Sequence, residues 1–124
     1  MAEHPQITHI RSVLSRLATE PPGQLEYLQR LGIGIDELAL EFDDVALGRD
    51  GLVDEGALTL DQADALAKID RQFTIMTDAG PSRWTEEAVT TGEDWQEVRR
   101  LARLALTKLN TQQSVGPGSA DATV

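Results

Sequence analysis

Carboxylates surround a glycine in the stretch GRDGLVDEGAL, residues 48–58, and this is the first place where metal chemistry is suggested. A calcium loop needs oxygen ligands at positions one, three, five, nine and twelve around a glycine at position six. With Gly51 at position six, these positions hold Ala46, Gly48, Asp50, Asp54 and Ala57. Three of the five have no side-chain oxygen, and the glutamate required at position twelve is absent. The pattern favours a helix end, a turn at Gly56 and a new helix, so we predict no metal site.

The other chemistry-bearing residues do not form a catalytic or cofactor-binding pattern. Cysteine is absent, which excludes thiolate nucleophiles and Cys-based metal sites. His4 and His9 are five residues apart, which places them on different faces of a helix. The glycines of GIG, residues 32–34, lack the third glycine of a dinucleotide-binding motif, because Glu37 occupies its place. We therefore predict no catalytic residues and no cofactor, and a protein that is not an enzyme.

Two tryptophans and a group of arginines each have a structural and a binding interpretation. Trp84 and Trp95 fit positions in a core or a seam between helices, although an indole can also stack on a ligand. The arginines within residues 99–103 can bind phosphate, pair locally or face the acidic helix of the same chain. The spacing of Glu97 and Arg100 favours a local pair on one helix.

The negative charge of the chain is concentrated in one segment. The formal net charge is −10 at pH 7. Residues 34–64 hold ten acids and one base, Arg49, and contribute −9, whereas residues 1–33 sum to zero and residues 65–124 to −1. Direct contact with nucleic acid or an anionic membrane requires the opposite sign. We therefore predict a basic protein partner, no direct nucleic-acid contact and no membrane contact.

The beginning of the sequence, MAEHPQITHIRSVLSRL, has no basic stretch followed by an uninterrupted apolar run. It therefore lacks the pattern of a secretory signal. No apolar run approaches the roughly 18 residues that a membrane-spanning helix needs. We expect a soluble, cytoplasmic protein.

Apolar residues recur at helical spacing, and no alternating strand pattern is present. Thr59, followed three residues later by Gln62, has the capping-box pattern of a helix start, and Ser82 is a candidate cap for a short helix. The glycines at 48 and 51 predict a break before a short helical turn that ends near Glu55. The expected helices span about residues 5–19, 23–31, 36–47, 60–79, 83–91 and 93–110.

Short connections favour antiparallel neighbours. We therefore predict an all-α, single-domain antiparallel bundle of four to six helices in residues 1–110. Residues 111–124 are small and polar and show no period, which predicts a disordered C-terminal tail.

The helix expected over residues 36–47 has two leucines outside its apolar face. At about 100° per residue, Leu40 and Leu47 fall among carboxylates, away from the core stripe. Either this helix is wedged between neighbours and both leucines are buried, or they are apolar anchors of a protein interface. In the second case the surrounding acids attract a basic partner. The predicted partner-binding residues are Asp36, Glu37, Leu40, Glu41, Asp43, Asp44 and Leu47.

These observations predict a small acidic protein-binding module. Its specific form is an inhibitor, immunity or antitoxin-like protein that covers a basic surface of a partner, such as a nuclease. In size and acidity the chain is similar to helical bacterial immunity proteins, with no family motif in common. The alternative is a non-inhibitory adaptor or regulatory subunit, which includes a homodimer. An enzyme or small-ligand binder ranks third.

Overall fold

The computed structural model describes the backbone of residues 3–119 and the side chains of residues 3–110. Over this range the chain is helical without any strand, which confirms the predicted all-α fold. The elements are α1 (Pro5–Ala18), α2 (Pro21–Leu31), α3 (Asp36–Ala46), α4 (Arg49–Asp54), α5 (Leu60–Ala79), the 3₁₀ turn η1 (Pro81–Trp84), α6 (Glu86–Thr91) and α7 (Glu93–Ser119). Five of these described helices have eleven residues or more, within the predicted range of four to six.

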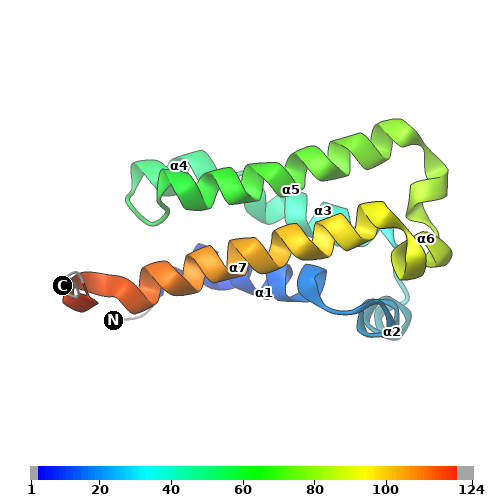
Figure 1. Ribbon diagram of the computed structural model, residues 1–124, viewed down its shortest axis with the longest axis horizontal. Coiled ribbons are helices and arrows are strands. Elements are labelled where there is room, and N and C mark those ends of the chain that lie inside the picture. The colour runs from blue at the N-terminus through cyan, green and yellow to red at the C-terminus, as the bar shows by residue number, and fades with distance from the viewer. Residues whose placement is uncertain (1–2, 120–124) are drawn as a thin grey trace.

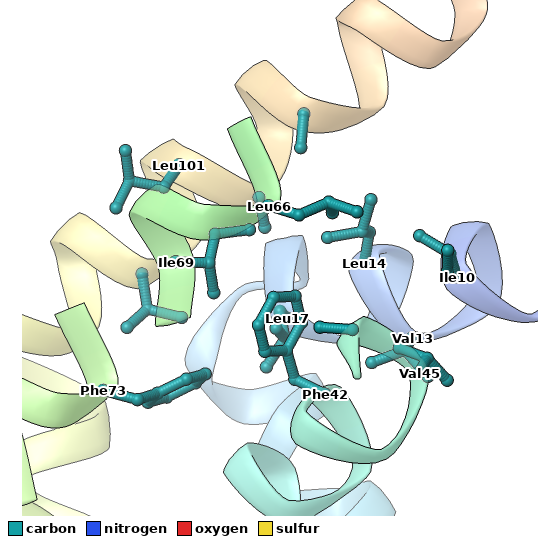
Figure 2. Close-up of a cluster of buried hydrophobic side chains, with 14 of the residues drawn as sticks. Ile10, Val13, Leu14, Leu17, Phe42, Val45, Leu66, Ile69, Phe73 and Leu101 are labelled. Carbon is teal, nitrogen blue, oxygen red and sulfur yellow. The ribbon is translucent and has the colours of Figure 1, made fainter. Parts of the chain in front are cut away.

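Four helices form a closed antiparallel bundle. Helix α7 packs on α1 and α5, and α3 completes the ring by packing on the same two helices. Figure 1 shows α5 and α7 running side by side in opposite directions, with α2 and α6 at one end. The core between the helices is mainly aliphatic. Figure 2 shows residues of this core, among them Ile10, Leu14, Leu17, Val45, Leu66, Ile69 and Leu101.

The stretch GRDGLVDEGAL forms α4 and the turn that leads into α5. Gly56 has a φ of 81°, a left-handed conformation that favours glycine at a helix end. The side chain of Thr59 accepts a hydrogen bond from the Gln62 amide at 3.0 Å, and the Gln62 side chain accepts one from the Thr59 amide at 2.9 Å. The predicted turn and capping box are therefore confirmed, and Asp50 and Asp54 lie on a helix instead of a loop.

Phe42, Phe73, Trp84 and Trp95 form one aromatic cluster toward the α6 end of the bundle. Trp95 is fully buried, and its ring lies edge-on to Phe73 and Trp84, with centroids 5.8 Å from each. Its indole Nε1 donates a hydrogen bond to the Arg83 carbonyl at 2.8 Å. The interpretation of Trp84 and Trp95 as packing residues is thus supported by their contacts.

Two helix boundaries differ from the prediction by three residues or more. The cap of α6 is Thr85, whose hydroxyl accepts from the Ala88 amide, and Ser82 lies inside η1. The reason is that Pro81 starts a separate turn, so extended backbone suited to a cap first occurs at Thr85. At the other end, α7 continues to Ser119, beyond the expected end near residue 110. The predicted disordered tail, 111–124, stays a prediction: residues 120–124 and the side chains from residue 111 onward lie outside the described residues.

Candidate protein-binding surface

Helix α3 exposes the two leucines that its sequence pattern singled out. Leu40 is 52% exposed and Leu47 is 74% exposed, whereas Leu38 on the opposite face is 1% exposed. Helix α3 contacts α1 and α5 through its buried residues and leaves the remaining side open. The interpretation that both leucines are buried between helices is therefore wrong for this chain.

The carboxylates around these leucines are also open to solvent. We define the α3 outer face as the exposed or half-buried residues Asp36, Glu37, Leu40, Asp43, Asp44 and Leu47. Leu40, Asp43, Asp44 and Leu47 are spaced at i, i+3, i+4 and i+7, so they lie next to one another on the helix. Within the described part of the chain, the acids of this face have no salt bridge or side-chain hydrogen bond. The α3 outer face therefore combines apolar side chains with unneutralised negative charge.

Glu41 belongs to a different environment from the other predicted residues. Its Oε1 accepts a hydrogen bond from Arg16 Nε at 3.1 Å, and its Oε2 accepts one from the Tyr27 hydroxyl at 2.6 Å. The Arg16 guanidinium also lies over the Tyr27 ring, 4.8 Å from its centroid. Burial, and then the hydrogen bond with Glu41, raises the pKa of the Tyr27 phenol. Both oxygens of Glu41 thus have partners on α1 and α2, and we exclude it from the α3 outer face.

A groove runs between α3 and α5 beside Leu40. It has a volume of about 230 Å³ and is lined by Ala39, Leu40, Phe42 and Asp43 from α3 and by Asp70, Phe73, Thr74, Thr77 and Asp78 from α5. The α5 residues of this lining were not predicted from the sequence. The polar ones among them are spaced at i, i+4, i+7 and i+8: Asp70, Thr74, Thr77 and Asp78. This spacing marks a polar stripe beside the apolar stripe of α5, and it is the pattern that could have identified these residues.

The arginines of α7 are held by other groups of the same chain. Arg99 is buried, and its Nη1 donates to the Gln24 side-chain oxygen at 3.0 Å and to the Val89 carbonyl at 3.1 Å. This burial lowers the pKa of Arg99. Arg100 donates to both carboxylate oxygens of Glu97, which confirms the predicted local pair and lowers the pKa of Glu97. Arg103 pairs with Glu20, so the three arginines do not converge on one site.

Comparison of the chain with protein-family models, curated proteins and solved structures finds no match. Among the described residues, no helix has both the length and the apolar character that crossing a membrane requires. The same part of the chain contains no group of three histidine or carboxylate side chains placed to hold a metal ion.

Proposed function

We propose that the protein is an acidic protein-binding module that covers a basic surface of a partner protein with the α3 outer face. The observation that carries this proposal is the exposure of Leu40 and Leu47 among carboxylates that have no partner in the described chain. On a surface with no partner, helical patterning places polar residues at such positions. Covering the exposed part of each leucine is worth on the order of 1–2 kcal/mol.

The charge distribution supports a basic partner in particular. Residues 34–64 contribute −9 of the net −10, and α3 with its flanking segments lies within that range. A concentrated negative field increases the association rate with a cationic surface and disfavours anionic competitors. The apolar anchors then slow dissociation by excluding water at the centre of the interface.

The specific form of the proposal is an inhibitor, immunity or antitoxin-like protein that acts in the cytoplasm on a nuclease or another nucleic-acid-binding protein. Such a partner has a basic surface that binds phosphates, and a row of carboxylates competes for the same cations. An adaptor or regulatory subunit would use the same face without blocking an activity. A self-associating protein would instead bury the α3 outer face against a second copy of the chain. Light scattering of the purified protein would detect this dimer.

Salt-dependent capture of partners from a native lysate tests this proposal. The wild-type protein is compared with D43K/D44K, which reverses two charges of the α3 outer face, and with E86K/E87K. The second variant is a matched control, because Glu86 and Glu87 are also adjacent, exposed acids on another helix. Circular dichroism establishes that all three proteins are folded.

We expect a basic protein to be captured by the wild type and by E86K/E87K, and to be lost with D43K/D44K. Capture should also decrease as the salt concentration rises, because opposite charges are screened. If no basic protein is recovered, or if the two variants capture it equally, the proposed function or its assignment to α3 is wrong.

A further inference from the structure

The groove between α3 and α5 has an apolar floor. Leu40 and Ala39 line it from α3, together with the aromatic rings of Phe42 and Phe73. The two ring centroids lie 6.0 Å apart with the planes inclined at 52°. Both phenylalanines are nearly buried, so they contribute the bottom of the groove. This floor can pack against the methylene groups of a guest side chain.

The rim of the groove contains hydrogen-bond acceptors. Asp43, Asp70 and Asp78 are its charged residues, and the described lining contains no lysine or arginine. The hydroxyls of Thr74 and Thr77 donate to carbonyls of α5, at 3.1 and 2.9 Å, and so their protons are already used. A complementary guest must therefore bring positive charge and hydrogen-bond donors of its own.

The size of the groove limits the guest to about one side chain. Its volume of about 230 Å³ is below the range of roughly 300–1,000 Å³ that is typical of sites for drug-sized ligands. An apolar stem that ends in a cation fits both the floor and the rim, and lysine and arginine have this form. Arginine is favoured because its planar guanidinium has five donors and can contact two carboxylates at once, whereas an ammonium is a compact, strongly hydrated charge.

Arginines of the chain itself already pair with carboxylates in this way, and two of them are instructive. The Nη2 of Arg49 lies 3.8 Å from the carboxylate of Asp70, a lining residue of the groove, and its Nη1 donates to the Ala46 carbonyl. Arg16 combines an aromatic ring and a carboxylate in the cluster with Tyr27 and Glu41. Asp70 already has Arg49 as an ion-pair partner, so the lining carboxylates without a partner in the described chain are Asp43 on one wall and Asp78 on the other.

We infer that the α3–α5 groove receives the side chain of a single arginine from the basic partner, with its stem against Leu40 and its guanidinium on the acidic rim to which Asp43 and Asp78 belong. This inference rests on the proposed function, because the groove adjoins the α3 outer face and shares Leu40 and Asp43 with it. It adds the identity of the central contact: the partner's arginine is the residue whose loss would weaken the complex most.

Amide chemical shifts in an NMR titration measure this binding without a known partner. The probe is N-acetyl-arginine methylamide, and the matched control is the citrulline analogue, which has the same shape but no charge. We expect the arginine probe to shift amides in residues 39–43 and 70–78, with a Kd on the order of millimolar. The citrulline analogue should bind at least about tenfold more weakly, since a tenfold change corresponds to about 1.4 kcal/mol of lost charge recognition.

Four variants locate the site. D78N and L40A should each weaken binding of the arginine probe several-fold, because both residues line the groove. L60A and D54N should leave it unchanged, because neither residue lines the groove. Leu60 is an exposed leucine outside the α3 outer face, and D54N removes the same charge as D78N. Equal binding of citrulline, equal effects of D54N and D78N, or shifts outside the two segments would overturn the inference.

The outcomes separate this inference from the proposed function. If a basic partner is captured and lost with D43K/D44K but the arginine probe does not shift the groove, the function stands and the arginine contact is wrong. If the arginine probe binds in the groove and no basic partner is captured, the chemistry of the groove stands and the proposed function is wrong.

Discussion

The buried Arg99 and the exposed acids of α3 show two opposite ways in which a helix of this protein carries charge. Arg99 is 4% exposed and has hydrogen-bond partners on α2 and α6. Asp43 and Asp44 are exposed and have no partner in the described chain. The buried charge connects three helices, whereas the exposed charges pair with no other group of the described residues. Changes at the first site should therefore affect stability, and changes at the second should affect binding alone.

Among truncations, the largest loss of stability is expected in the interior at Trp95. Trp95→Ala removes a fully buried indole, its edge-on contacts with Phe73 and Trp84, and its hydrogen bond to Arg83. Replacing a large buried aromatic by alanine costs about 3–5 kcal/mol. Urea denaturation should show this decrease in the free energy of unfolding, with Trp95→Phe less affected. A change in W95A below about 1 kcal/mol would contradict the packing described here.

A smaller loss of stability is expected at Arg99. Arg99→Met keeps a long apolar stem but leaves the Gln24 side-chain oxygen and the Val89 carbonyl without their donor. Each buried acceptor left unsatisfied costs roughly 1–3 kcal/mol. The neighbouring Arg100→Met is the matched control, because Arg100 is exposed and, among the described residues, pairs only with Glu97. If both variants are equally stable in urea denaturation, the buried network does not connect the helices as proposed.

Substitutions on the α3 outer face should leave the stability of the protein nearly unchanged. Leu40→Asp and Leu47→Asp each change the free energy of unfolding by about 0.5 kcal/mol or less, as expected of exposed positions. Leu38→Asp is the control on the same helix: Leu38 is 1% exposed, so a buried unpaired carboxylate should unfold the domain. Thermal melts of the three variants measure the difference. If Leu40→Asp also unfolds the protein, α3 is wedged between neighbours after all.

Features that depend on neighbouring residues in the sequence could be predicted. The capping box of Thr59 and Gln62 spans three residues, and the break after Ala46 follows from glycines within the same segment. The helical wheel of α3 likewise separated its buried stripe from Leu40 and Leu47 correctly, because the period of one helix determines which residues share a face.

Features that depend on which helices pack together could not be predicted. The partners of Glu41 lie 14 and 25 residues away, and the contact of Arg99 with Gln24 spans 75 residues. The helical wheel of α3 therefore placed Glu41 with the partner-binding acids. It could not show that Arg16 and Tyr27 donate hydrogen bonds to the Glu41 carboxylate. For the same reason, the second wall of the groove, from Asp70 to Asp78, became visible only when α5 was placed beside α3.

The smallest expected effect concerns Tyr27, and it tests whether Glu41 belongs to the interior or to the α3 outer face. The pKa of the phenol is raised from 10.0, first by burial and then by its hydrogen bond to Glu41. The folded state therefore holds this proton more tightly than the unfolded state. The resulting stabilisation is present below the unfolded pKa and is lost as the pH rises through the folded pKa.

Because Tyr27 is the only tyrosine, phenolate absorbance in an alkaline titration reports this one group. In Glu41→Gln the pKa should fall part of the way toward 10.0, since the negative charge beside the phenol is removed while the burial remains. Asp44→Asn removes the same charge from the α3 outer face and should leave the titration unchanged, because Asp44 does not contribute to the pKa shift. If Glu41→Gln and the wild type titrate equally, the Glu41 carboxylate does not bind the Tyr27 hydroxyl. Glu41 would then belong with the partner-binding acids.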